Sequence, residues 1–213
     1  MSVDTTALSQ ACERNKDPIL ALLRPLLGHA RQILEIGSGT GQHAIYFAGQ
    51  LPHVLWQPSD THEYLPLLRR ALQPPRPANL LEAIELDVRE RPWAVRSCDA
   101  AFSANTLHIM DWSSVGEFFR GVGAVLETGG ILCVYGPFRY GGRYTSDSNA
   151  AFDRFLQERD PRSGIRDFDA VDALAQAQGL RLEHDHAMPA NNQFLVWRKE
   201  SASGGIHLAE RQG

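Results

Sequence analysis

Three glycines directly follow a short apolar run early in the chain, in residues 33–41 (ILEIGSGTG). Glycine has no Cβ, so the backbone can turn tightly at the end of a strand and a ligand can touch the main chain. Gly37, Gly39 and Gly41 have the spacing G-x-G-x-G, whereas the dinucleotide fingerprint is G-x-G-x-x-G. The segment therefore predicts a nucleotide-like ligand at a strand-to-helix turn and disfavours a pyrophosphate there; a tight turn without a ligand is the alternative.

Two acidic residues follow the next two predicted strands. Asp60 lies 23 residues after Gly37, where a carboxylate can accept hydrogen bonds from both hydroxyls of a ribose. Asp87 follows the third predicted strand, where it could accept a hydrogen bond from the exocyclic amine of an adenine. Either acid alone could equally cap a helix or lie in a solvated loop. Both together, after this glycine segment, favour a site for an adenosine.

Lysine is rare in this chain, and its rarity excludes several chemistries. It occurs only at Lys16 and Lys199, and every other basic residue is an arginine. A Walker A loop needs Gly-Lys-Ser/Thr, a short-chain reductase needs Tyr-x-x-x-Lys, and pyridoxal phosphate needs a lysine for its Schiff base. Neither lysine has such a context, so ATP hydrolysis by a P-loop and pyridoxal catalysis are both excluded.

The elements that must position these residues alternate along the chain. Between residues 33 and 198, short apolar runs alternate with segments of helical period, which is typical of βαβ units in a mostly parallel α/β sheet. In the helix predicted at 112–126, Ser114 and Glu117 have the spacing of a capping box and Gly129-Gly130 follows as a breaker. Strands are predicted at 32–36, 54–57, 81–86, 100–104, 131–135, 180–188 and 193–198, and helices at 18–24, 42–51, 62–72, 112–126, 149–156 and 169–178.

The last two predicted strands are joined by only four residues, 189–192, a connection too short for a parallel crossover. They must therefore form an antiparallel hairpin. A polar, glycine-rich stretch at 138–166 is interpreted as an insertion that covers the active site. We divide the chain into a lead-in segment with a short helix (1–30), a catalytic domain (31–200) and a frayed tail (201–213).

Length and composition favour one globular domain in a reducing compartment. The 213 residues, 43% of them apolar, can form a core without disulfides. Three cysteines, Cys12, Cys98 and Cys133, lie far apart without the spacing of a zinc site. The net charge of −4 disfavours strong binding to nucleic acid. The chain has neither a secretory leader nor a run of 18 apolar residues, so we expect a cytoplasmic protein that does not span a membrane.

The glycines and acids together resemble class I S-adenosylmethionine-dependent methyltransferases, in which E-x-G-x-G-x-G is followed by acids after strands two and three. The match covers roughly residues 30–200. It implies S-adenosylmethionine as cofactor and a Rossmann-like, doubly wound sheet of seven strands in the order 3-2-1-4-5-7-6, mostly parallel with a C-terminal antiparallel hairpin. The cofactor-binding residues that it implies are Glu35, Gly37, Gly39, Gly41, Asp60, Asp87 and Asn105.

Short segments elsewhere resemble one family more narrowly, the DUF938 family, which includes methyltransferase-like protein 26. These segments are ERNKDPI at 13–19, NTLHI at 105–109, GPF at 136–138, GIRD at 164–167 and PANN at 189–192. The family is functionally obscure, so the resemblance implies a fold and a cofactor more firmly than a substrate.

Residues on the substrate side follow from the topology, because ligands of open α/β sheets bind beyond the carboxyl ends of the strands. His108, in the segment after strand four, is the preferred base for a neutral acceptor; a loop residue bonded to backbone is the equal alternative. Tyr135, grouped with His108 as catalytic, and Tyr140 would form aromatic walls. The polar triplet Arg14, Asn15 and Lys16 could bind an anionic group or simply form a turn, and Asn191 and Asn192 lie in the hairpin turn.

Methyl transfer from a sulfonium is an in-line displacement, in which alignment and exclusion of water can lower much of the barrier. A carboxylate or thiolate acceptor needs no base. The motif that nucleic-acid amino-methylating enzymes carry after strand four, Asn-Pro-Pro-Tyr or Asp-Pro-Pro-Tyr, is absent after Asn105, which disfavours base methylation. His184 and His186 lie on one face of a strand, where a structural role is favoured over a metal, and we expect no metal ion.

The sequence therefore predicts a methyltransferase that uses S-adenosylmethionine on a small-molecule or protein acceptor, of unknown oligomeric state. Two rivals remain: a non-catalytic module that binds the same cofactor, and an NAD(P)-linked reductase built on the same kind of sheet. The methyl acceptor is not defined by the sequence.

Overall fold

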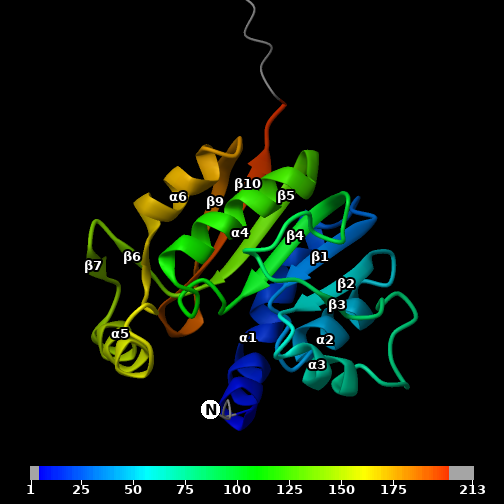
Figure 1. The fold of residues 1–213 in the computed structure, drawn as a ribbon, viewed down its shortest axis with the longest axis horizontal. Helices are drawn as coiled ribbons and strands as arrows, with labels where there is room; N and C mark the ends of the chain where they lie inside the picture. Colours follow the sequence, from blue (N-terminus) through cyan, green and yellow to red (C-terminus); the bar gives the residue numbers. More distant parts are fainter. Residues whose placement is uncertain (1–4, 202–213) are drawn as a thin grey trace, which may run out of the picture.

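A seven-stranded sheet forms the centre of the protein (Figure 1). The structure, a computed structural model, describes residues 5–201, so all but the first residue of the predicted tail lies outside the described residues. The strand order is β3-β2-β1-β4-β5-β10-β9. The first five strands of this order pair with one another in parallel, and β10 runs antiparallel to both of its neighbours, β5 and β9. When the seven strands of this sheet are numbered in chain order, their spatial order is 3-2-1-4-5-7-6. This order confirms the predicted fold class and its hairpin. The bounds are β1 (Gln32–Ile36), β2 (Leu55–Asp60), β3 (Ile84–Glu85), β4 (Cys98–Ala104), β5 (Leu126–Gly136), β9 (Leu180–Met188) and β10 (Asn192–Lys199).

Helices cover both faces of this sheet. On one face lie α1 (Thr5–Leu26), α2 (Gln42–Gln50) and α3 (Leu65–Ala71), and on the other lie α4 (Trp112–Val125) and α6 (Phe168–Gln176). Successive residues of a strand point to opposite faces. Ile33 of β1 accordingly joins the core under α1 and α2, whereas Leu34 joins the core under α4. Burial on both faces explains why the central strands are mostly apolar and do not alternate between apolar and polar residues.

The first helix is much longer than the sequence predicts. The expected helix at 18–24 is part of α1, which continues through Pro18 and Pro25. Packing outweighs the local proline signal because a stripe of apolar side chains at helical spacing is buried against the sheet. Residues 14–16 therefore lie within a helix and not in a polar turn. The stripe consists of Cys12, Ile19, Leu23 and Leu27.

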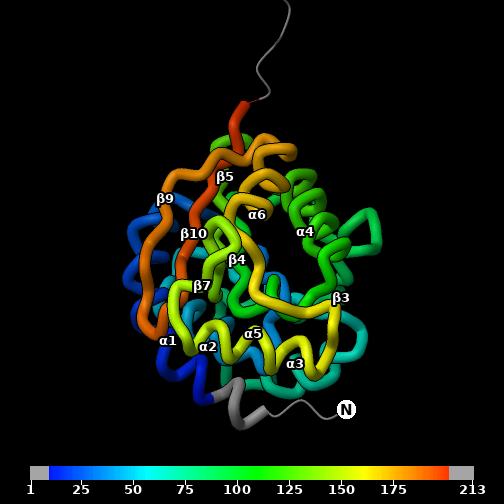
Figure 2. The backbone as a smooth tube through the Cα atoms, turned by 90° about the vertical axis from the view of Figure 1, so that its left-hand side faces the viewer, coloured from blue at the N-terminus to red at the C-terminus, as the bar shows by residue number. Residues whose placement is uncertain are grey.

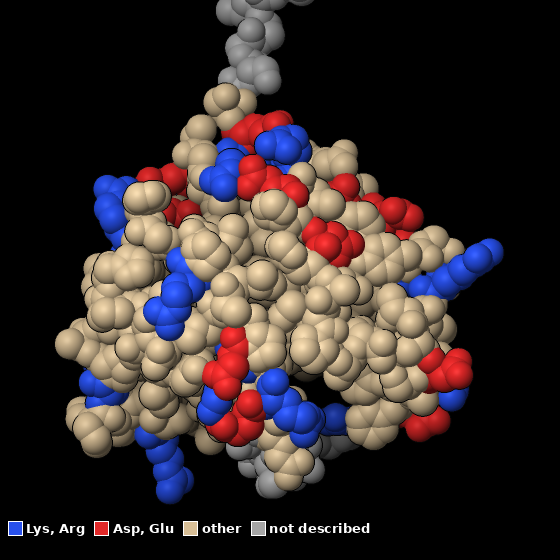
Figure 3. All heavy atoms as spheres, turned by 180° about the vertical axis from the view of Figure 1, so that it is seen from behind, with Lys and Arg blue, Asp and Glu red and all other residues tan. Residues whose placement is uncertain are grey.

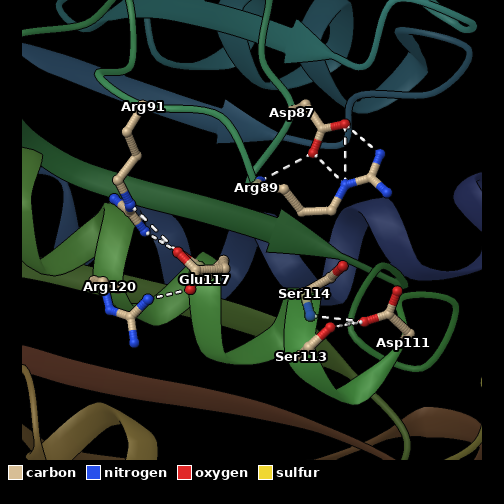
Figure 4. Close-up of polar contacts among 8 residues, drawn as sticks. All are labelled: Asp87, Arg89, Arg91, Asp111, Ser113, Ser114, Glu117 and Arg120. Carbon is tan, nitrogen blue, oxygen red and sulfur yellow. Dashed lines mark hydrogen bonds and ion pairs between the residues drawn. The ribbon is translucent and has the colours of Figure 1, made fainter.

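The helix predicted at 112–126 agrees with α4 to within one residue, but the residues predicted to mark its start and end do not do so. Asp111 is the N-cap, and its carboxylate accepts hydrogen bonds from the Ser114 amide and the Ser113 hydroxyl. The predicted capping box is wrong, because Glu117 instead faces the arginines at positions 91 and 120 (Figure 4). Gly129 and Gly130 lie inside β5, which begins directly after the helix at Leu126. The predicted strand at 81–86 is reduced to two residues of β3.

The segment at 138–166, which we call the roof, forms short elements outside the central sheet. These are β6 (Phe138–Tyr140), β7 (Arg143–Tyr144) and α5 (Asp147–Arg159), and β6 pairs with both β7 and β8 (Arg166–Asp167). Figure 2 shows α5 running along the lower side of the molecule between the hairpin side and α3. At its start, the Asn149 amide donates to the Asn191 carbonyl of the hairpin turn over 2.9 Å. Between α5 and β8, the Gly164 amide donates to the His108 carbonyl over 2.9 Å.

The surface carries acidic and basic side chains in a mixed pattern. On the face behind the sheet in Figure 1, blue and red groups are interspersed among uncharged residues, and a hollow opens at the lower edge (Figure 3). All three cysteines are free and buried. Within residues 5–201, the structure has no helix with the length and hydropathy needed to cross a membrane.

Candidate functional site

The glycine segment forms a bend that lies against the neighbouring strands. The amides of Gly37 and Ser38 both donate to the Ser59 carbonyl, over 3.1 and 2.9 Å, which holds the bend at the end of β2. Gly37 has φ +77°, and a Cβ there would lie 2.8 Å from the Thr106 Cγ2 atom. Gly39 also has positive φ, but a Cβ on it would meet nothing within 4 Å. The bend is thus closed at Gly37 and open at Gly39.

Replacing Gly37 by alanine should strain the backbone and displace Thr106. A left-handed conformation costs a non-glycine residue roughly 1–2 kcal/mol, and the clash adds to that cost. Gly129 is a matched control, since it has φ +81° with nothing within 4 Å of a Cβ. Chemical denaturation should therefore show a larger loss of stability for Gly37→Ala than for Gly129→Ala. Equal losses of stability in the two variants would mean that the Thr106 side chain can move aside without a measurable cost in free energy.

Glu35 lies beneath this bend, inside the core. Its carboxylate accepts a hydrogen bond from the Trp56 indole over 2.8 Å, and its carbonyl accepts one from the Ser59 hydroxyl over 2.6 Å. Burial raises the pKa of Glu35 to about 7, although hydrogen bonds from Trp56 and Ser38 act in the opposite direction. The side chain therefore supports the bend from below, and its carboxyl is partly protonated at neutral pH.

Asp60 ends β2 and is bonded to the bend. Its Oδ2 accepts the Gly39 amide over 2.7 Å and its Oδ1 accepts the Thr61 amide over 2.8 Å. Burial raises its pKa, and these amide hydrogen bonds oppose that shift. An ionised carboxylate has about four acceptor positions. The Gly39 and Thr61 amides and the Thr61 hydroxyl act on three of them, and a hydroxyl can rotate to another acceptor, so two positions are available to a ligand once it does.

Asp87 lies two residues beyond β3 and is already paired. Its two oxygens face the Arg89 guanidinium, with Oδ1 2.9 Å from Nε, and Oδ1 also accepts the Arg89 amide (Figure 4). These hydrogen bonds lower its pKa. The Arg89 side chain is largely exposed. A ligand that binds to Asp87 would therefore either share the carboxylate with the Arg89 guanidinium or displace that guanidinium.

His108 is buried in the segment after β4. Its ring contacts Phe152 of the roof edge to face at 5.4 Å, and a Cβ on Gly136 would lie 3.6 Å from its Nδ1. Burial and, to a smaller extent, the charge of Arg166 lower the pKa of His108 to about 4, although the charge of Asp153 acts in the opposite direction. The ring is therefore neutral at neutral pH, and the structure gives it no hydrogen-bond partner among residues 5–201. Before it, Asn105 adopts φ +57° and donates its amide to the Tyr135 carbonyl.

Arg166 fixes the backbone around His108, and the sequence did not single out its role. Its guanidinium donates to the carbonyls of Leu107 (3.1 Å) and Met110 in the loop, and to that of Arg162 (3.0 Å) in the roof. The hydrogen bonds join the loop to the roof. The GIRD segment, which contains Arg166, was the signal in the sequence that could have drawn attention to this residue. The neighbouring residues gave no indication of which carbonyls it binds.

Three predicted residues from distant parts of the chain meet at the end of β5. The side-chain amides of Asn15 of α1 and Asn192 of the hairpin lie close enough to the Tyr135 hydroxyl to lower its pKa, and the Asn192 Nδ2 donates to the carbonyls of the hairpin turn. Asn15 also contacts His43 of α2, with 2.7 Å between Oδ1 and Nε2. Burial raises the pKa of Tyr135, and the two amides counter that shift. Sequence reasoning missed His43, whose pKa burial lowers to about 4.

The other predicted substrate residues have partners of their own. Lys16 pairs with Glu13 and lies over the Tyr46 ring. The Tyr140 hydroxyl donates to Asp185 over 2.7 Å, and its ring stacks on Phe168. These contacts do not bring Lys16 or Tyr140 to the group around Tyr135. Asn191 contributes its carbonyl to the roof, and Arg14 is exposed beside Tyr135.

Two other features lie away from this edge. A depression of about 520 Å³ is lined by Gly49, Leu55 and neighbouring residues, where β2 begins and not where it ends. His184 and His186 stack at 5.1 Å on β9. In the described part of the chain, no three His, Cys, Asp or Glu residues group in a way that could hold a metal ion.

Comparison with known proteins gives one family and many similar folds. The family model "Protein of unknown function (DUF938)" matches residues 6–199. An O-methyltransferase family protein from Burkholderia thailandensis superposes with a TM-score of 0.79 at 16% identity, over 93% of this chain and 61% of that one. Human N-acetylserotonin methyltransferase, solved with S-adenosylmethionine, gives 0.77 at 16% identity, over 92% and 55%.

A putative O-methyltransferase from Nostoc punctiforme gives a TM-score of 0.77 at 19% identity, over 91% of this chain and 58% of that one. The chain thus spans between about half and two thirds of the length of these three proteins. At such identities the likeness shows the fold, which is that of the class I methyltransferases.

Proposed function

The chain belongs to the DUF938 family, and from that premise we propose that it is an S-adenosylmethionine-dependent methyltransferase acting on a small molecule or a protein group. The observation that carries the proposal is the bend at Gly37, closed on Thr106, open at Gly39, and tied to the carboxylate of Asp60. Two proteins with similar folds were solved with S-adenosylmethionine or S-adenosylhomocysteine.

The residues at the bend fit an adenosyl cofactor. Asp60 can accept two hydroxyls of a ribose once the Thr61 hydroxyl rotates away from it, and a Cβ on Gly39 would meet no atom within 4 Å. Asp87 would receive the adenine amine, and Asn105 would complete the site after β4. When bound, S-adenosylmethionine supplies an electrophilic methyl group on a sulfonium.

The chain's own contribution is to position the acceptor and exclude water. The roof, held at Asn191 and His108, lies over the end of the sheet where Tyr135 and His108 are found. Orientation of two reactants can contribute roughly 7–11 kcal/mol to lowering a barrier. His108 is neutral and could accept a proton, but its low pKa makes it a weak base.

Binding calorimetry distinguishes this function from the reductase. We expect S-adenosylmethionine and S-adenosylhomocysteine to bind in preference to NADH, because the G-x-G-x-G spacing departs from the G-x-G-x-x-G of sites that bind a pyrophosphate. Preference for NADH would refute the proposal. Tight cofactor binding without transfer of labelled methyl to any metabolite or peptide pool would instead identify a binding module.

A cytoplasmic location is part of the same proposal. It is supported by the three free, buried cysteines, which are typical of a reducing compartment. Imaging of the tagged protein in the cells that produce it would test the location.

A further inference from the structure

We propose that Arg166 is a positioning residue for methyl transfer, which holds the segment at 105–110 so that the His108 ring faces the methyl acceptor. We call this segment the β4 loop. The inference rests on the proposed function and adds a residue to its site. Arg166 does not touch the acceptor itself, because it acts through the main chain of the β4 loop.

The main chain of the β4 loop is bound by the roof. Four consecutive carbonyls, those of residues 107–110, each accept a hydrogen bond from it. The Arg166 guanidinium donates to the first (3.1 Å) and to the last, the Gly164 amide to the second (2.9 Å) and the Ser163 hydroxyl to the third (2.8 Å). Each peptide unit is planar. Fixing four carbonyls in a row therefore also fixes the direction in which the His108 side chain leaves the backbone.

The donors of the roof are themselves held in place. The buried carboxylate of Asp153 on α5 accepts the Ile165 amide over 2.5 Å and the Tyr144 hydroxyl over 2.6 Å. The Arg166 guanidinium lies over the Trp112 ring at 6.0 Å, where α4 begins. Its planar fork presents several donors in a fixed geometry, whereas an ammonium group is a compact point charge. An arginine therefore suits a position from which two carbonyls are bound at once.

The β4 loop also lies against the glycine bend. A Cβ at Gly37 would lie 2.8 Å from the Cγ2 atom of Thr106. The amides of Ile109 and Met110 donate back to the Thr106 carbonyl, over 3.0 and 3.3 Å. A single turn thus joins the bend that we propose for the cofactor to the side chain that we propose for the acceptor.

The ring nitrogens of His108 are open to a ligand. The residue is 6% exposed, and neither ring nitrogen has a hydrogen-bond partner among residues 10–201. In the same part of the chain, the fully enclosed side-chain nitrogens and oxygens without a partner belong to Trp93 and Arg139. The His108 nitrogens are therefore not fully enclosed. Nδ1 lies beside Gly136 at the end of β5, 3.6 Å from where a Cβ would be, which places it at the carboxyl edge of the sheet.

Replacing Arg166 by lysine keeps the positive charge and removes the fork. A misplacement of about 1 Å can cost roughly a hundredfold in rate, even when the mutation lies far from the chemistry. We therefore expect Arg166→Lys to lower the maximal rate of methyl transfer roughly tenfold to hundredfold. Its affinity for S-adenosylhomocysteine should not change, because the hydrogen bonds of the glycine bend and of Asp60 do not involve Arg166.

The kinetic experiment measures transfer of tritiated methyl from S-adenosylmethionine into a heat-treated extract of the cells that produce the protein. A dilution series of the extract separates the maximal rate from the dilution that gives half of it. Arg91→Lys is the matched control, because that guanidinium donates to the Glu117 carbonyl over 2.7 Å and lies over the Trp93 ring at 5.8 Å. It should keep the rate of the wild type.

Equal maximal rates in Arg166→Lys and the wild type would overturn the inference and leave the methyltransferase intact. Absence of transfer in the wild type would instead refute the proposed function, and with it the role of Arg166 in catalysis.

A double variant tests whether Arg166 acts through His108. Arg166→Lys should cost little further rate in a His108→Ala background, because both changes remove the same contact with the acceptor. Losses that multiply would mean that Arg166 acts by another route, which would overturn the inference.

The position of the ring can also be measured without cofactor or turnover. Isotope-labelled histidine gives an NMR resonance of the His108 ring, assigned by its absence in His108→Ala and sensitive to the Phe152 ring at 5.4 Å. We expect this resonance to shift in Arg166→Lys, and less in Ser163→Ala, which removes a single hydroxyl and serves if the lysine variant does not fold. Arg91→Lys should leave it in place. An unchanged resonance in both roof variants would overturn the inference, whether or not the protein transfers methyl groups.

Discussion

Replacing Asp60 by alanine is expected to weaken the binding of S-adenosylmethionine roughly a hundredfold to ten-thousandfold. Beyond the amides of Gly39 and Thr61, the carboxylate can accept two ribose hydroxyls when the Thr61 hydroxyl rotates away from it. Each hydrogen bond to a charged acceptor contributes roughly 1.5–3 kcal/mol, and every 1.4 kcal/mol changes affinity about tenfold. Calorimetry with the purified variant measures the effect directly.

Asp99 offers a matched control at the opposite edge of the sheet. Its carboxylate accepts the amides of Arg31 and Gln32, each over 2.9 Å, much as Asp60 accepts two amides. Asp99→Ala should therefore lower stability without changing cofactor affinity. If Asp60→Ala binds the cofactor as tightly as Asp99→Ala does, Asp60 does not hold the ribose.

Acidification from pH 7 to pH 4.5 is expected to destabilise the Glu35→Gln variant by roughly 5 kcal/mol. Burial lowers the pKa values of His43 and His108 from 6.5 to about 4. Their contribution to stability is therefore complete above pH 6.5 and is lost as the pH falls toward 4, because the unfolded chain binds protons first. One pKa unit corresponds to about 1.4 kcal/mol.

The wild type should lose less stability over the same range, roughly 2 kcal/mol, because Glu35 acts in the opposite sense. Its pKa is raised from 4.5 to about 7, so its contribution is complete below pH 4.5 and is lost as the pH rises toward 7. Urea unfolding at several pH values measures these slopes. His108→Gln should flatten the wild-type curve. A curve that His108→Gln does not alter would mean that the pKa of His108 is the same in the folded and the unfolded protein.

The central sheet could be predicted from the sequence because its determinants are local. The strands β1 and β4 are buried on both faces, so each is a mostly apolar segment in which a polar residue such as Glu35 or Ser103 is the exception. The four-residue connection before β10 required an antiparallel hairpin, as observed. The glycines at 37, 39 and 41 all have positive φ, which is the conformation that their residue type permits at least cost.

Elements that depend on distant contacts could not be predicted in the same way. Pro18 looks like a helix start, but the buried stripe of α1 carries the helix through it. Strands β6, β7 and β8 have only two or three residues, which is too short to show a period. The cap at Asp111 and the apparent box at Ser114 are equally good local signals, and only the packing of α4 decides between them.

The candidate site shows the same division. Asp60 and the glycines could be identified from their spacing and from their positions at the ends of predicted strands. In the structure, the Gly39 amide donates to the Asp60 carboxylate. Asn15, Tyr135 and Asn192 were each singled out separately, but their contact arises from three elements far apart in the chain. His43 has no local feature that distinguishes it from any helical residue, and its link to Asn15 is visible only in three dimensions.

The roof has a consequence for how this family could diversify. It leaves the central sheet after Gly136 and returns at α6, so none of its strands belongs to the layer that positions the glycine bend. Mutations accumulating in this one segment could therefore alter the choice of acceptor while the adenosyl end is inherited unchanged. New acceptor specificities would then evolve with the same methyl donor, through changes in the roof and without changes in the central sheet.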